Sequence, residues 1–311
     1  MANQHHIKLR KPVRWHIGVF LAPAAGVYTT VMVVPLIVTL VQAFYGADGD
    51  RSAFVGVANF LRLFSDSHWS DGFWRALGNN TWFFIIHMLV QNPVGVALAA
   101  LLSQRTLAFR SVYRTAIFVP TILSFVIVGF VWKLILSPLW GVTPTVLGSV
   151  GLDWMFGPWL GMEGSALTTL GLISVWQFVG IPMMLIYAAL LSIPGEVLDA
   201  AECDGITGMA QFWKIQLPLV LPSIGMISIL TFVGNFNAFD LVYVTQGAVA
   251  GPNGATDLLG TYLYRTFFGF QMQQGDPNMG STVASVMLLI LLAVVCAYLW
   301  LVQSKLRRYQ F

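Results

Sequence analysis

Long apolar runs alternate with short polar connections along this chain. Windows of about 20 apolar residues are long enough to cross a bilayer as a helix. Such windows occur at 16–45, 78–103, 114–137, 166–193, 219–245 and 281–303. Backbone groups in lipid must hydrogen-bond within the chain, so each window is predicted to be a helix. The pattern therefore predicts an all-α integral membrane protein with about six transmembrane helices.

Composition supports the bilayer as the solvent. The chain is 57% hydrophobic and 9% charged, whereas soluble domains carry roughly 25% charged residues. The first apolar run exceeds the roughly 7–15 residues of a cleavable signal, so it is predicted to be a retained span. Basic residues are scattered, which argues against nucleic-acid binding. Cys203 and Cys296 form no disulfide framework or metal-ligand spacing, and no catalytic or metal constellation is found.

Lysine and arginine are distributed unevenly among the predicted connections. The N-terminus, the second and fourth connections and the C-terminus hold Lys8, Arg10, Lys11, Arg14, Arg105, Arg110, Arg114, Lys214, Lys305, Arg307 and Arg308. The other connections hold Arg51, Arg62, Arg75 and Arg265, and Lys133 lies near a span end. Positive charge favours the cytoplasmic side. Both termini are therefore predicted to be cytoplasmic, as tails 1–15 and 304–311 around a transmembrane domain at 16–303.

One polar segment, PGEVLDAAECDGITGMAQFWKIQLP at 194–218, interrupts the apolar pattern on the predicted cytoplasmic side. The acids in GEVLDAAEC suit the positive end of a helix dipole, and Asp204-Gly205 then permits a turn. A second short helix is predicted over 207–216, ended by Pro218. The pattern predicts a helix–turn–helix. By itself it fits either an amphipathic interfacial loop or a docking element.

The same segment resembles the EAA loop of binding-protein-dependent ABC importer permeases, whose pattern is E-A-A-x-x-D-G followed by an aromatic residue and L-P. The sequence DAAECDG at 199–205 takes this register, with Asp199 replacing the leading Glu and Ile206 replacing a small residue. Further similar stretches are FVGVANFLRLF (54–64), NNTWF (79–83), WQFVGIPMMLIYAALLSIP (176–194), FNAFDLVYVTQG (236–247), GPNGATDLL (251–259) and YLYRTFF (262–268). From about residue 54 onward, the chain resembles the maltose- and glycerol-phosphate-type branch.

This resemblance implies the transmembrane permease subunit of an ATP-driven importer. It implies that the 194–218 loop couples to a cytoplasmic ATPase through Asp199, Ala200, Ala201, Asp204, Gly205, Ile206, Met209, Phe212 and Pro218. The implied partners are a second homologous permease subunit in a heterodimer, two cytoplasmic ATPase subunits, an extracytoplasmic solute-binding protein and the lipid bilayer. The implied location is the inner membrane of a bacterium, with several membrane crossings.

ATP hydrolysis is not expected on this chain. A phosphate-binding P-loop places Gly immediately before Lys. The lysines here follow Ile, Arg, Trp, Trp and Ser. ATP and magnesium are therefore expected on the partner ATPases, with no cofactor on this subunit. The alternative is an ion-coupled secondary transporter of small polar solutes, which would need no ATPase.

Polar residues within the apolar windows are candidates for a solute pathway, because they are costly in lipid. The favoured set is Asn235, Asn237, Asp240, Phe236, Tyr243 and Gln177, with His87, Gln91 and Asn92 as further candidates. Hydrogen bonding between helices is the alternative role for these groups. Amides, a carboxylate and aromatic rings suit a sugar or glycoside. Lys133 and Arg265 are the basic residues in or beside the spans, which favours a neutral solute.

Overall fold

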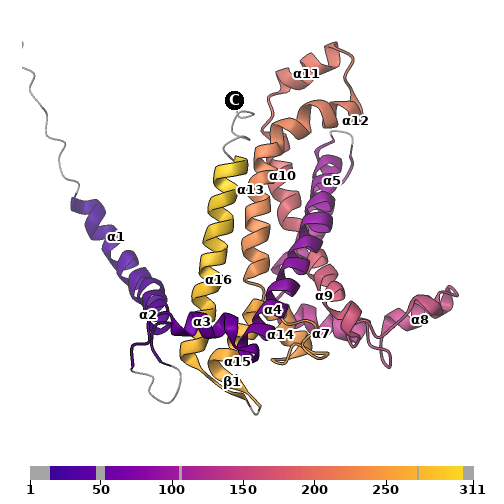
Figure 1. Ribbon diagram of the computed structural model, residues 1–311. Helices are drawn as coiled ribbons and strands as arrows, with labels where there is room; N and C mark the ends of the chain where they lie inside the picture. Colours follow the sequence, from indigo (N-terminus) through magenta and orange to yellow (C-terminus); the bar gives the residue numbers. More distant parts are fainter. Residues whose placement is uncertain (1–14, 47–52, 105–106, 272, 304–311) are drawn as a thin grey trace, which may run out of the picture.

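The computed structural model describes residues 15–46, 53–104, 107–271 and 273–303, and these are almost entirely helical. Helices α5, α10, α13 and α16 form the body of the molecule (Figure 1). The α11–α12 hairpin extends beyond one end of this body, and α3, α15 and β1 lie at the other end. Helix α1 stands apart from the body, and α8 projects away from it.

The first part of the chain contains α1 (Trp15–Tyr28), α2 (Val34–Gln42), α3 (Ala58–Ser65), α4 (Ser67–Ile86), α5 (Asn92–Ser103), α6 (Arg110–Phe118), α7 (Phe125–Ile135), α8 (Val142–Ser149), α9 (Glu163–Phe178) and α10 (Gly180–Leu191). The second part contains α11 (Gly195–Cys203), α12 (Gly208–Gln211), α13 (Leu217–Phe236), α14 (Asp240–Gln246), α15 (Leu259–Phe268) and α16 (Pro277–Tyr298). Strands β1 (Gly269–Phe270) and β2 (Gln273–Gln274) form a short antiparallel hairpin. Short π-helical or 3₁₀ turns join several of these helices.

The number of candidate membrane spans in the structure agrees with the predicted six, but several of these spans are bent or broken. Within the described residues, the helical segments long and apolar enough to cross a bilayer are 18–42, 67–103, 208–246 and 277–302. The bent pairs α6–α7 and α9–α10 bring the number to as many as 6. The predicted tails at 1–15 and 304–311 lie outside the described residues, apart from Trp15, as do Arg51 and Arg105.

The window at 114–137, predicted to be one helix, is a bent pair of helices in the structure. The segment from α6 to Ile122 meets α7 at 99°. Pro120 has no N–H to continue the helical hydrogen bonds. Ser124 is extended, and its hydroxyl oxygen accepts from the Ile127 N–H at 3.3 Å, which starts α7 as a new helix.

The predicted span 78–103 begins earlier than expected. Helix α4 starts at Ser67, where the Asp66 carboxylate accepts from the His68 N–H at 3.0 Å. The window at 166–193 is divided by a bend of 42° between α9 and α10. Gly180 at this bend lies so close to α6 that a Cβ would meet the Ile117 carbonyl oxygen at 3.0 Å. Glycine therefore allows these two helices to touch.

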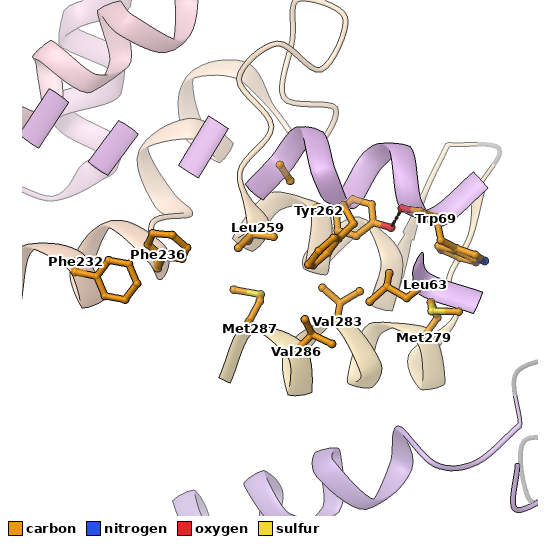
Figure 2. Packing of buried hydrophobic residues seen from close by; sticks show 12 residues of the cluster. Leu63, Trp69, Phe232, Phe236, Leu259, Tyr262, Met279, Val283, Val286 and Met287 are labelled. Atoms are coloured by element: carbon orange, nitrogen blue, oxygen red, sulfur yellow. Dashed lines mark hydrogen bonds between the residues drawn. The ribbon is translucent and has the colours of Figure 1, made fainter. Parts of the chain in front are cut away.

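Buried side chains at the α3 and α15 end hold several helices together. Phe73 from α4, Leu259 and Tyr262 from α15, and Met279 and Val283 from α16 pack into one apolar cluster (Figure 2). The Tyr262 hydroxyl donates to the Trp69 carbonyl oxygen at 2.8 Å. Burial of aromatic and aliphatic surface therefore fixes this end of the molecule.

Two adjacent asparagines on α4 fasten the loop between α14 and α15. The Asn79 amide donates to the carbonyl oxygens of Ala255 and Asp257 at 3.2 and 2.9 Å. The Asn80 amide donates to the Asn235 carbonyl oxygen at 2.8 Å, and its own oxygen accepts from the Leu259 N–H at 2.6 Å. Asn80 is fully buried. One side chain therefore joins α4, the end of α13 and the start of α15.

An ion pair closes the same loop. The Arg265 guanidinium donates to both oxygens of the buried Asp257 carboxylate, at 2.5 and 3.1 Å. It also donates to the Ala248 carbonyl oxygen at 2.9 Å. Arg265, one of the two basic residues that the sequence places in or beside the spans, is thus engaged in holding the loop.

Replacing Asn80 with Leu should destabilise the protein by about 2 kcal/mol, because the Leu259 N–H loses its buried acceptor and the Asn235 carbonyl oxygen loses one of its donors. The expected result is a lower thermal midpoint of the purified protein, followed by intrinsic fluorescence. Thr81→Val is the matched control, because the exposed Thr81 hydroxyl donates only to Leu77 of its own helix. Equal thermal midpoints for the two variants would show that Asn80 does not stabilise the contact among α4, α13 and α15.

Candidate functional site

The fifth span is broken near the end of α13, where the sequence predicted an unbroken helix over 219–245. The backbone leaves the helix at Asn237, with φ −95° and ψ 6°, and passes through Phe239 at φ −146° and ψ −54°. Helix α14 then starts at Asp240. A backbone break at membrane depth requires other partners for its polar groups. Asn80 supplies one of them at the Asn235 carbonyl oxygen.

A cavity of about 310 Å³ lies at this break. Its lining comes from α4 and the turn after it, α7, α9, α10, α13 and α14. The polar groups in the lining are His87, Gln91, Ser174, Thr231, Asn235, Asn237 and Asp240. Aromatic lining comes from Phe83, Phe125, Phe178 and Phe239. A mainly apolar wall with a few polar groups is typical of a small-molecule site.

Two buried acceptors in this lining lack hydrogen-bond donors among the described residues. They are the side-chain oxygens of Gln91 and Asn235, and each residue is 6% exposed. The neighbouring His87 has partners on both ring nitrogens. The His87 ring contacts the Phe83 carbonyl oxygen at 2.8 Å and the Ser174 hydroxyl at 3.0 Å. An unpaired buried carbonyl is costly, so the two oxygens are suited to accept from hydroxyl groups of a solute.

The structure brings together three of the six residues predicted for the pathway. Asn235, Asn237 and Asp240 line the cavity. Phe236 instead packs against Phe232, with ring centroids 4.3 Å apart, in the apolar cluster of Figure 2. That contact directs Phe236 into the core.

The remaining two predicted pathway residues lie outside the lining. Gln177 is 1% exposed, and its amide donates to the Leu123 carbonyl oxygen at 3.0 Å, which satisfies the break between α6 and α7. Tyr243 stacks on Phe239 at 4.9 Å. Ser174 lines the cavity without having been predicted. A single serine in an apolar window does not distinguish a cavity residue from an ordinary helix residue. Its place in the lining became visible only through its contact with the His87 ring.

The predicted helix–turn–helix at 194–218 is present as α11 and α12. Gly205 adopts φ +75°, and its N–H donates to the Glu202 carbonyl oxygen at 3.0 Å. The Ile206 N–H donates to the Ala201 carbonyl oxygen at 2.8 Å. Together these bonds form a Schellman C-cap, in which glycine takes the left-handed position. The sequence Asp-Gly-Ile therefore fixes the turn through its backbone.

Further contacts make the hairpin a defined unit. The Gln211 amide donates to the Leu198 carbonyl oxygen at 3.1 Å and ties α12 to α11. Phe212 packs against the apolar cluster around Leu190. Contrary to the prediction, Pro218 does not end the second helix. The π-helical turn at 212–216 carries the chain from α12 directly into α13.

The hairpin presents acids and apolar side chains outward. Asp199, Ala200 and Asp204 are exposed, whereas Ala201 is buried. Met209 is 69% exposed and Trp213 is 60% exposed. Ile206, at the turn, is half-buried. A Cβ at Gly205 would meet nothing within 4 Å, which places the turn in open space.

No metal centre is found in the part of the chain that the structure describes. It contains no group of three or more His, Cys, Asp or Glu side chains that could hold a metal ion.

Comparison with known proteins places most of the chain in one family. The family described as "Binding-protein-dependent transport system inner membrane component" matches residues 91–307. This match includes the broken fifth span, the hairpin and the cavity lining from Gln91 onward.

Curated relatives match over nearly their whole length. A probable ABC transporter permease protein, YurN of Bacillus subtilis, is 29% identical over 88% of this chain and 91% of its own. A probable starch degradation products transport system permease protein, AmyD of Thermoanaerobacterium thermosulfurigenes, is 27% identical over 92% of this chain and 93% of its own. The lactose transport system permease protein LacF of Rhizobium radiobacter is 27% identical over 99% of this chain and 100% of its own.

A solved structure shares the fold. It is a chain of a bacterial alginate ABC transporter in complex with an alginate pentasaccharide-bound periplasmic protein. The TM-score is 0.78 at 20% sequence identity, over 94% of this chain and 95% of that chain. The two chains therefore share the same overall helix arrangement.

Proposed function

Because the chain belongs to the family of binding-protein-dependent transport system inner membrane components, we propose that it forms one half of the solute pathway of an ATP-driven importer. A second homologous permease subunit forms the other half. The chain is a multi-pass membrane permease. Its place is the inner membrane of a bacterium, with the α11–α12 hairpin on the cytoplasmic side.

The proposed solute is a sugar or glycoside. The observation that carries this proposal is the cavity at the break of the fifth span, where the buried oxygens of Gln91 and Asn235 lack donors among the described residues. Sugar hydroxyls are donors of the required kind. Relatives named for lactose and starch degradation products support the same class of solute. The phenyl rings of the lining offer apolar contact to the sugar ring.

The energy comes from two separate cytoplasmic ATPase subunits, which bind ATP and magnesium. The α11–α12 hairpin is the docking element for one of them. An exposed acidic helix, an open turn at Gly205 and the exposed Met209 can remain solvated when free and be covered on docking. Because α12 continues into α13, a displacement of the hairpin reaches the cavity through one helix.

The opposite end of the molecule receives the extracytoplasmic solute-binding protein. The loop between α14 and α15 is held there by Asn79, Asn80 and the Asp257–Arg265 pair. Because Asn80 also contacts the end of α13, binding at this loop is transmitted to the cavity.

An ion-coupled secondary transporter is the second candidate function. One observation favours it: Asp240 is an exposed carboxylate at the cavity, where a proton or sodium ion could bind. The α11–α12 hairpin would then have no partner to explain its exposed apolar side chains. The ATP-driven function gives a partner both to the hairpin at one end of the molecule and to the loop between α14 and α15 at the other.

Gly205→Trp should abolish docking of the ATPase, because the bulky ring would fill the open space at the turn. Tagged protein from its native membrane would be recovered in mild detergent, and its bound chains identified by mass spectrometry. The expected result is loss of the ATPase with retention of the second permease. Gly205→Asn is the control, since Asn tolerates the left-handed conformation.

Equal recovery of the ATPase by Gly205→Trp and Gly205→Asn would contradict the docking role. Met209→Asp provides a second variant without backbone strain, because Met209 is an exposed residue of α12 and its helical backbone accepts any ordinary side chain. It too should lower ATPase recovery while the permease pair stays intact.

Gln91→Met should weaken transport about tenfold, corresponding to about 1.4 kcal/mol for one lost acceptor. The measurement is the initial rate of ATP-driven sugar uptake in proteoliposomes. Leu89→Met is the matched control, because this side chain lies on the same turn and is 71% exposed. An unchanged rate for Gln91→Met would remove Gln91 from the pathway.

A further inference from the structure

Four aromatic rings continue outward from the cavity as one group. Phe239 and Tyr243 stack with centroids 4.9 Å apart and planes inclined at 27°. Tyr264 on α15 lies 5.5 Å from Phe239 and 5.2 Å from Tyr243. Phe268 lies 5.1 Å from Tyr264. These four residues, Phe239, Tyr243, Tyr264 and Phe268, are here called the aromatic platform.

The platform is continuous with the cavity. Phe239 belongs to both, since it lines the cavity and contacts two platform rings. Tyr243 and Tyr264 are half-buried, and Phe268 is 68% exposed. Exposure therefore rises from the cavity toward Phe268. Helices α14 and α15, which carry the other three platform residues, lie at the end opposite the α11–α12 hairpin (Figure 1).

Core packing does not account for the platform. Helix α15 buries Leu259, Tyr262 and Thr266 on one face. Tyr264 and Phe268, four residues apart, share another face. Phe267 packs so closely against Gly280 of α16 that a Cβ at this glycine would meet the phenylalanine side chain at 2.8 Å. The two outward rings are thus distinct from the rings that hold the fold.

The two tyrosine hydroxyls also give the platform polar groups. A hydrogen bond with Tyr243 raises the pKa of Tyr264 above its ordinary value. The hydroxyls of Tyr243 and Tyr264 can each donate or accept a hydrogen bond. A ring face beside hydroxyls suits a sugar ring, whose C–H groups form an apolar face and whose edge carries hydroxyls.

We propose that the aromatic platform is a second saccharide subsite, outward of the cavity, and that the solute is a saccharide of more than one ring. One ring of the solute occupies the cavity at Gln91 and Asn235. The next ring stacks on Phe239, Tyr243 and Tyr264. This inference rests on the proposed function and goes beyond it, because it excludes a monosaccharide as the preferred solute.

The test uses the complete transporter in proteoliposomes, with its binding protein in excess and ATP inside. Uptake is measured for glucose, lactose, maltotriose and arabinotriose. The unmodified transporter should take up at least one of the three larger saccharides, and glucose poorly. Tyr264→Leu and Tyr243→Leu should each lower that uptake rate by about tenfold. Phe20→Leu, an 82% exposed ring on α1, is the control and should leave the rate unchanged.

Three results would overturn the subsite. One is an uptake rate for Tyr264→Leu equal to that of Phe20→Leu. Another is glucose uptake as fast as that of every larger saccharide. The third is loss of the second permease subunit from purified Tyr264→Leu, which would make the platform a contact between subunits. If uptake by the unmodified transporter needs no ATP, the proposed function itself fails, which is a separate outcome.

Discussion

The need to satisfy backbone polar groups inside a bilayer governs the rest of this structure. A break in a membrane helix frees N–H and C=O groups that water cannot reach. The fifth span breaks near Asn237, and the buried Asn80 supplies a donor to the Asn235 carbonyl oxygen and an acceptor for the Leu259 N–H. That arrangement lets the chain open a cavity among apolar helices without leaving these groups unpaired.

The same principle explains the second break. Between α6 and α7, the carbonyl oxygen of Leu123 accepts from the Gln177 amide at 3.0 Å. The Thr121 hydroxyl in turn donates to the Gln177 carbonyl oxygen at 3.0 Å. Polar side chains within spans therefore divide into two groups. Asn80 and Gln177 donate to backbone carbonyl oxygens beside broken helices, whereas Gln91 and Asn235 lie in the cavity lining. The side-chain oxygens of Gln91, Asn235 and Gln177 are buried and lack donors among the described residues.

The two ends of the molecule are joined through α13. At one end the α11–α12 hairpin leads through a π-helical turn into this helix. At the other end α13 stops at the cavity, against Asn80 and the loop that Asp257 and Arg265 close. In the proposed ATP-driven importer, a force applied at the hairpin would thus reach the cavity through helical segments that follow one another directly in the chain.

Hydropathy predicted the membrane-spanning segments well, because length and apolar content follow directly from bilayer thickness. The Asp-Gly turn was also predictable, since glycine takes the left-handed position there. The break at Asn237 was not. No glycine or proline lies in NAFD, and the break depends on Asn80, 155 residues away from Asn235 in the sequence. Phe236 was predicted for the pathway, but consecutive residues of a helix point in different directions. Its ring therefore packs into the apolar cluster, while its neighbours Asn235 and Asn237 line the cavity.

The most direct test of the account is the energy source of transport. The purified permease pair, with its ATPases and binding protein, would be sealed in proteoliposomes, and sugar uptake measured with ATP inside and every ion gradient dissipated. The account predicts uptake that requires ATP and stops when the ATPases are omitted. Uptake that persists without ATP, driven by a proton or sodium gradient, would contradict it and move attention to Asp240.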